Sequence, residues 1–119
     1  MAKTKFQWND LIQVINSKNT GDIQFVPYLK DEKELAQYMV AFANSEGGKI
    51  ILGFNKSSLQ LTGFDNNKDW ILSVAKRNCT PSLNIHLSEI KRGDRKVFVI
   101  DVPEGNDKPY KANNISYTR

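Results

Sequence analysis

Residues 41–55 read Ala-Phe-Ala-Asn-Ser-Glu-Gly-Gly-Lys-Ile-Ile-Leu-Gly-Phe-Asn, and the rest of the chain can be assigned around them. An amphipathic helix arrives from Asp31 and stops at the glycine pair, and an apolar strand, Ile50–Phe54, follows at once. Glycine adopts the left-handed backbone that closes a helix, and it allows another backbone to approach closely. The polar residues at this junction are Asn44, Ser45, Glu46 and Lys49. The residues expected to shape the junction are Asn44, Gly47, Gly48 and Lys49. Such a junction can hold a ligand, and it is equally typical of an ordinary helix-to-strand connection.

Three helices are predicted from the one-sided spacing of apolar residues. The first spans Phe6–Asn16. The second begins at Asp31, which resembles the first residue of a capping box. The third begins at Asn66 and carries Lys76 and Arg77 in its last turn, where cations suit the helix dipole.

Strands are predicted where β-prone residues alternate or form short apolar runs between turn residues. Ile50–Phe54 has almost no polar alternation, which indicates a strand buried on both faces. Residues 109–118 favour a small hairpin, since Asn113 and Asn114 tolerate the positive φ that its turn needs. The other predicted strands are Asp22–Val26, Leu59–Leu61, Leu83–Leu87 and Val97–Val102. The chain is therefore predicted to be α+β, with about three helices on a mostly antiparallel or mixed sheet and a C-terminal β-hairpin.

Length and composition indicate one ordinary globular domain. The chain has 119 residues, which is enough for a single core. Hydrophobic residues make up 39% and charged residues 25%. No apolar run approaches the roughly 20 residues of a membrane span, and the first residues lack a signal-peptide core. Cys79 is the one cysteine, which excludes an internal disulfide and fits a reducing cytosol, so a cytoplasmic location is expected.

The charge favours an anionic partner. The net charge is +4 and the pI is about 9.2, which attracts polyanions by long-range steering. The basic residues fall into three groups, with Tyr110 and Tyr117 among the last: Lys76 and Arg77; Lys91, Arg92, Arg95 and Lys96; Lys108, Lys111 and Arg119. Basic side chains neutralise phosphates, and exposed aromatic rings stack on unpaired bases. The alternative is a solvated charged turn and two tyrosines that pack against the sheet.

Several catalytic and cofactor chemistries are disfavoured. Gly48-Lys49 does not form a phosphate loop, because Ala43 and Ile50 stand where that motif requires Gly and Ser or Thr. His86 shares the polar face of its strand, and Cys79 follows a helix C-terminus, which does not lower a thiol pKa. A structural zinc site needs several His or Cys ligands. No cofactor and no metal is predicted.

Carboxylate chemistry stays open at this point. A metal-dependent nuclease needs two or three carboxylates that converge on a divalent ion. The chain has 13 acidic residues. The candidates are Glu46, Asp65, Asp101 and Asp22, and nothing in their spacing indicates that they converge.

The motifs resemble those of the Schlafen AlbA-like domain. Residues 41–54 are similar to its run of Ala-Phe-Ala-Asn, two or three small or polar residues, Gly-Gly and a strand ending Ile-Gly-Val. Residues 78–81 are similar to its Ile-x-Pro segment, and residues 95–103 to its Lys-x-Val-x-x-Ile-x-Val-Pro strand. Lys108-Pro109-Tyr110 and Tyr117-Thr118-Arg119 are similar to its last two motifs. The likeness runs from about Gly21 to the last residue.

The resemblance implies a nucleic-acid-binding domain or, in some members, a ribonuclease. Members occur in bacterial transcriptional regulators, in RecG-helicase-like proteins and in vertebrate Schlafens. Relatives usually continue beyond the closing Arg, so residues 1–119 are expected to be the N-terminal domain of a longer protein, with residues 1–20 as a helical extension. Nuclease-active relatives carry acids at the positions of Gln24 and Asn55, and neutral amides cannot supply the charge that holds a catalytic cation. The resemblance thus favours a domain without catalytic activity.

Three hypotheses follow. The first is a non-catalytic nucleic-acid-binding domain of a bacterial transcriptional regulator, with DNA favoured over RNA and weak sequence specificity. Its phosphate contacts are predicted at Lys76, Arg77, Arg92, Arg95, Lys111 and Arg119. The second is an interaction or homodimerisation module that uses the edge of the terminal hairpin. The third is a metal-dependent ribonuclease that uses Glu46, Asp65 or Asp101.

Overall fold

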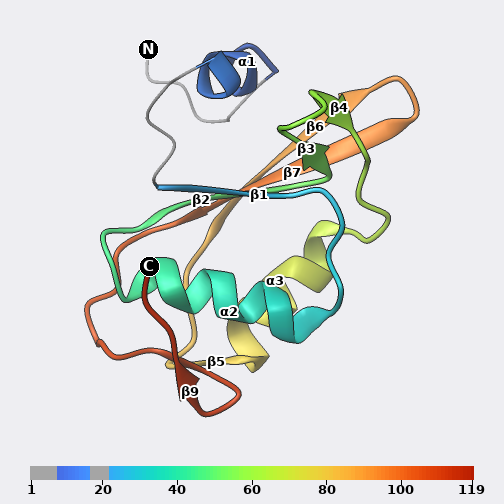
Figure 1. Cartoon of the computed structure of the whole chain (residues 1–119). Helices are drawn as coiled ribbons and strands as arrows, with labels where there is room; N and C mark the ends of the chain where they lie inside the picture. Colours follow the sequence, from blue (N-terminus) through green and yellow to red (C-terminus); the bar gives the residue numbers. More distant parts are fainter. Residues whose placement is uncertain (1–7, 17–21) are drawn as a thin grey trace, which may run out of the picture.

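The computed structural model describes residues 8–16 and 22–119, and this part of the chain forms one α+β domain, as predicted (Figure 1). It contains three helices, α1 (Trp8–Asn16), α2 (Glu32–Ala43) and α3 (Lys68–Arg77). The strands are β1 (Ile23–Val26), β2 (Gly48–Leu52), β3 (Phe54–Asn55), β4 (Gln60–Leu61), β5 (Cys79–Thr80), β6 (His86–Arg92), β7 (Arg95–Val102), β8 (Lys111–Ala112) and β9 (Ile115–Ser116). Phe6, where the first helix was predicted to start, lies outside the described residues, as do the other residues of the predicted extension that precede or follow α1.

The central sheet is mixed and has four strands in the order β1-β2-β7-β6. Strands β1 and β2 are parallel, and α2 forms the crossover between them. Strand β7 pairs antiparallel with both β2 and β6. Helices α2 and α3 lie on one side of this sheet and α1 on the other (Figure 1). Two small sheets, β3-β4 and β5-β8-β9, complete the fold, and β8 with β9 is the predicted terminal hairpin.

The sheet is buried on both faces. Ile50 and Leu52 belong to the larger apolar cluster, which includes the buried side chains of α2 and α3. Ile51 belongs to a second cluster on the opposite face, where Leu11 of α1 is fully buried. The unbroken apolar run of β2 is therefore explained by its position between two cores, as predicted.

The helix starts follow capping chemistry. Asp31 caps α2, and its carboxylate accepts a hydrogen bond from Glu34 N at 3.0 Å, as predicted. Helix α3 is capped by Asn67 and not by Asn66, because Asn67 Oδ1 accepts from Trp70 N at 3.0 Å. None of the helices in the described segments combines the length and apolar character that crossing a membrane requires.

Several predicted strands differ from the observed ones in their limits, and two of these differences have a clear physical cause. The strand predicted as Ile50–Phe54 ends at Leu52, because Gly53 turns the chain with φ 94° and its carbonyl accepts from the backbone of Thr62 and Gly63. The strand predicted as Leu83–Leu87 is β6, which begins at His86. Leu83 instead donates its N–H to Ala75 O and packs into the main core.

Candidate nucleic-acid interface

The junction after α2 is a packed connection. Gly47 has φ 82° and donates its N–H to Phe42 O at 2.9 Å, which closes the helix end. A Cβ on Gly47 would lie 2.8 Å from Val102 O. A Cβ on Gly48 would lie 2.3 Å from the ring of Phe42. Both glycines are therefore required because other parts of the chain approach them closely.

Asn44 holds the C-terminal segment to α2. Its Nδ2 donates to Tyr110 O at 2.9 Å and to Tyr117 O at 2.8 Å, and its Oδ1 accepts from Tyr110 N at 2.6 Å. The partners lie 66 and 73 residues further along the chain. The side chain thus satisfies three main-chain groups on either side of the β8–β9 hairpin, which gives Asn44 a structural role.

The last residues pack back onto α2 and β1. Ser45 Oγ accepts from Arg119 N at 3.1 Å. The Arg119 guanidinium lies 4.2 Å from the centre of the Phe42 ring and donates to Gln24 Oε1 at 3.0 Å. Arg119 is therefore engaged within the domain, and its predicted phosphate contact stays a prediction.

Tyr110 does not offer a stacking surface. Its side chain is 6% exposed and belongs to the main core, and its hydroxyl accepts from Asp107 N. Tyr117 is half-buried and packs against the same core. The alternative interpretation, in which these tyrosines pack inward, is confirmed for Tyr110.

Lys49 lies in the sheet beside an acid. It faces Asp101 across the β2–β7 pair, and Nζ lies 3.4 Å from the Asp101 carboxylate. The lysine is about one-third exposed and the aspartate about half. A pair of this kind adds little stability in water.

The β6–β7 hairpin concentrates positive charge at its tip. Arg92 pairs directly with Arg95, and Lys91 pairs directly with Lys96. Like charges placed directly opposite on neighbouring strands repel each other and destabilise the pair. Because successive side chains of a strand project to opposite faces, each face of the hairpin tip carries one of these like-charged pairs. We call these four residues the hairpin cations.

Contacts with neighbouring elements orient the hairpin cations. The Arg92 guanidinium lies 4.2 Å from the centre of the Trp8 ring, and Arg95 donates to Leu61 O. Lys96 Nζ lies 5.4 Å from the centre of the Phe98 ring. Lys91 is paired with Glu89 at 3.6 Å. A stacked guanidinium keeps its edge N–H groups directed outward, and this edge is the part that binds a phosphate.

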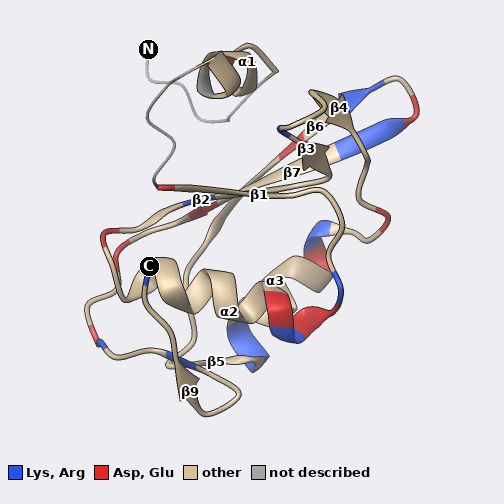
Figure 2. Cartoon of the chain, in the orientation of Figure 1, with Lys and Arg blue, Asp and Glu red and all other residues tan. Residues whose placement is uncertain are grey.

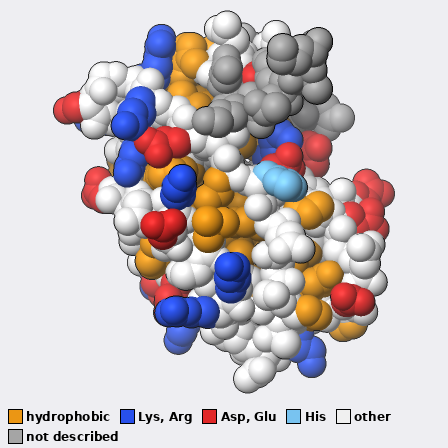
Figure 3. Space-filling view, turned by 180° about the vertical axis from the view of Figure 1, so that it is seen from behind, with side chains coloured by type: hydrophobic (Ala, Val, Ile, Leu, Met, Phe, Trp, Pro, Cys, Tyr) orange, Lys and Arg blue, Asp and Glu red, His pale blue; other side chains and the backbone are white. Residues whose placement is uncertain are grey.

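The other predicted contacts lie at the far end of the molecule. Lys76 and Arg77 end α3, and Lys111 of β8 faces Thr80 of β5 next to them. Figure 2 shows this group below the sheet and the hairpin cations at the opposite end. The six predicted residues therefore do not form one patch, and Figure 3 shows acidic side chains interspersed among the basic ones.

The candidate acids do not converge. Asp101 pairs with Lys49 in the sheet, whereas Asp65 lies in the loop before α3. Among the described residues, no group of three His, Cys, Asp or Glu side chains is placed to hold a metal ion. Asn55 Oδ1 accepts from Ser57 N and Ser58 N, so its amide stabilises the β3–β4 turn.

The remaining reactive side chains have ordinary surroundings. Cys79 is buried, and burial raises the pKa of its thiol to about 12, which keeps it protonated. His86 is exposed at the start of β6, as predicted. Burial and the hydrogen bond to Glu34 raise the pKa of Tyr38.

A surface groove lined by aromatic residues was not predicted. Tyr28, Phe64 and Trp70 line it, and they come from three separate segments of the chain. No pattern in the sequence links these segments. The Thr62 hydroxyl donates to Pro27 O at 2.6 Å, which holds the loop before α3 against the segment after β1.

The comparisons with known proteins agree with this architecture. The profile of the family described as Schlafen, AlbA_2 matches residues 15–119. The DIP2311 protein from Corynebacterium diphtheriae has a similar fold, with a TM-score of 0.64 and 16% identity over 87% of this chain. This chain spans 23% of that protein.

A second solved structure is similar over most of its own length. It is the N-terminal domain of a protein related to the ATP-dependent DNA helicase RecG, from Nitrosomonas europaea, with a TM-score of 0.59 and 19% identity. The similarity covers 92% of this chain and 84% of that one. None of the curated proteins matches the sequence. Because the family profile matches residues 15–119, which is nearly all of the 119 residues, the chain belongs to the Schlafen AlbA_2 family.

Proposed function

We propose that this domain binds nucleic acid without cleaving it, through contacts to phosphate that centre on the hairpin cations. The observation that carries the proposal is the presence of two like-charged cross-strand pairs at the hairpin tip, Arg92 with Arg95 and Lys91 with Lys96. Like charges directly opposite each other disfavour strand pairing, and a polyanion bound along either face of the hairpin would offset this. Phosphate contacts dominate non-specific nucleic-acid binding, which agrees with the weak sequence specificity expected here.

Lys76, Arg77 and Lys111 provide a second region in this proposal. They lie at the opposite end of the domain, so a short ligand on the hairpin tip would not contact them (Figure 2). We infer that they add affinity only for ligands long enough to reach around the domain. Binding that strengthens with ligand length, and only while these residues are intact, supports this role.

The finer parts of the proposal rest on resemblance. The structural neighbour from Nitrosomonas europaea is related to a DNA helicase, which favours DNA over RNA. A role in a bacterial transcriptional regulator and a cytoplasmic location follow from the family resemblance alone. The absence of cleavage is supported by Gln24 and Asn55, whose amides bind within the domain to Arg119 and to the β3–β4 turn.

Fluorescence anisotropy tests the proposal directly. Labelled single- and double-stranded DNA and RNA are titrated with the wild type and with an Arg92→Gln/Arg95→Gln variant. A Lys33→Gln/Lys108→Gln variant, which loses the same charge elsewhere, is the matched control. We expect at least about tenfold weaker binding for the hairpin variant and a smaller loss for the control. Equal losses would show that only net charge matters, and no binding by the wild type would refute the proposal.

The other two functions have their own tests. Ile115, on the edge strand β9, is 53% exposed, which gives a specific observation in favour of pairing between two copies. Light scattering that shows a dimer, together with no binding of nucleic acid, would favour that function. Labelled RNA incubated with Mn²⁺ or Mg²⁺ tests for a ribonuclease, and cleavage that is lost when Asp65 or Asp101 is replaced would establish it.

A further inference from the structure

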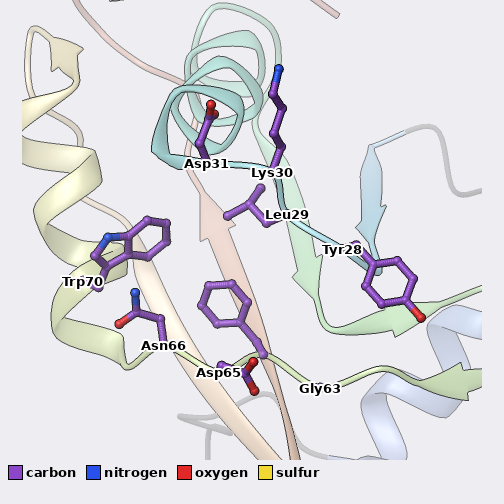
Figure 4. A pocket seen from close by; sticks show the side chains of 9 residues that line it. Tyr28, Leu29, Lys30, Asp31, Gly63, Asp65, Asn66 and Trp70 are labelled. Atoms are coloured by element: carbon purple, nitrogen blue, oxygen red, sulfur yellow. The ribbon is translucent and has the colours of Figure 1, made fainter.

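Two cavities near the hairpin cations share part of their lining, and we call the two together the groove. One has a volume of about 320 Å³ and the other about 290 Å³, and both are lined by Gly63, Phe64 and Asp65. The first continues to Trp70 and Tyr28 (Figure 4). The second continues to Arg95 and Lys96. The groove thus leads from the charged hairpin tip to an aromatic pocket.

The aromatic pocket has rings at both ends. Trp70 projects from the first turn of α3, and Tyr28 projects from the segment after β1 (Figure 4). The centres of the Phe64 and Trp70 rings lie 5.9 Å apart, and Phe64 also packs edge-on against Phe98. Tyr28 is 77% exposed and belongs to neither apolar cluster. Phe64 and Trp70 thus form a packed pair of rings on one side of the pocket, and the exposed Tyr28 lies at its other end.

The charge of the groove selects among possible ligands. The basic residues that line its two parts are Lys30, Arg95 and Lys96, and the acidic ones are Asp31, Asp65 and Asp94. The groove as a whole is therefore balanced, which suits neither a free phosphate nor a cation. The cations at the hairpin end and the rings at the other end fit a ligand that carries phosphate and an aromatic ring at separate places.

We infer that the groove binds single-stranded nucleic acid, with an unpaired base stacked in the aromatic pocket and its neighbouring phosphates on Arg95 and Lys96. This inference rests on the proposed function and adds the preference for single strands. A base in a duplex is already stacked and paired, so it cannot enter the pocket without being released. Asp65 and Asn66 stand at the pocket, where their polar atoms can meet the edge of a base.

Replacement of Tyr28 tests the inference without disturbing the core. Stacking of one base on an aromatic ring changes affinity by about 5- to 150-fold when the ring is removed. We expect Tyr28→Ala to weaken binding of a single-stranded oligothymidylate by at least about fivefold, while Tyr28→Phe, which keeps the ring, stays within about twofold. Leu59→Ala, another exposed side chain at 63%, is the control outside the groove.

A spectroscopic readout locates the base. The chain has two tryptophans, so a Trp8→Phe variant leaves Trp70 as the only one. Stacking of a base next to Trp70 should quench its emission in proportion to the bound fraction, and adding Tyr28→Ala should reduce that quenching. Duplex of the same length should give little quenching.

The outcomes separate the inference from the proposed function. If binding depends on Arg92 and Arg95 but is unchanged by Tyr28→Ala, the inference that the groove binds single strands is wrong, and the proposed function still holds. Tighter binding of duplex than of single strands, with no quenching of Trp70, also overturns it. Absence of binding to any nucleic acid refutes both.

Discussion

Replacement of Asn44 by Ala should destabilise the domain rather than remove a ligand contact. The substitution removes hydrogen bonds to three main-chain groups, Tyr110 O, Tyr117 O and Tyr110 N. Each such bond contributes about 0.5–1.5 kcal/mol, and the site is half-buried, so the expected loss is about 2–3 kcal/mol. For a domain of this size, a loss of that order lowers Tm by roughly 10 °C.

Thermal and urea unfolding followed by circular dichroism measures this loss. Asn44→Asp should destabilise at least as much, because a carboxylate cannot donate and would face two carbonyl oxygens. Ser45→Ala is the neighbouring control, and it should lose only about 1 kcal/mol since it removes the bonds to Ala41 O and Arg119 N. An Asn44→Ala protein whose unfolding free energy stays within about 0.5 kcal/mol of the wild type would refute the structural role of Asn44.

Three further predictions follow from the same structure. Gly47→Ala should lower the unfolding free energy by roughly 2 kcal/mol more than Gly93→Ala. Both glycines have positive φ, but of the two only a Cβ on Gly47 would meet backbone, 2.8 Å from Val102 O. Equal unfolding free energies for the two variants would contradict this. Asp101→Asn should change the unfolding free energy by less than about 1 kcal/mol, since its pair with Lys49 is exposed, and a larger loss in urea unfolding would count against that view. Cys79 should resist thiol reagents at pH 8 in the folded protein. Burial raises the pKa of the Cys79 thiol from 9.0 to about 12. The contribution of the buried thiol to stability should therefore be complete below pH 9 and be lost as the pH rises toward 12. Rapid labelling of Cys79 in the native protein would contradict its burial.

Local patterns explain why much of the fold was predictable. The apolar face of α2, its cap at Asp31 and the double burial of β2 all follow from residues that lie close together in the sequence. The turn at Gly93, where φ is 64°, also has a local cause, because this glycine stands between two charged, strand-prone segments. The ends of strands were less predictable, since Gly53 ends β2 through contacts with residues 62 and 63, which no pattern near residue 53 specifies.

The candidate site was only partly predictable. The positive charge at Arg92 and Arg95 was visible, but the direct pairing of like charges depends on the register of the hairpin. The role of Asn44 depends on partners that are 66 and 73 residues away, and the burial of Tyr110 follows from those same contacts. The aromatic groove combines three distant segments, so it became visible only in the folded chain.

The salt dependence of DNA binding tests the central claim most directly. Kd for a labelled oligonucleotide duplex is measured at several salt concentrations for the wild type and for Arg92→Gln/Arg95→Gln. If the hairpin cations contact phosphates, binding weakens steeply with salt, and the double variant lowers the slope of log Kd against log salt by roughly 2, about 0.9 per lost contact. A slope that is the same in both proteins, or binding that does not respond to salt, would contradict the claim.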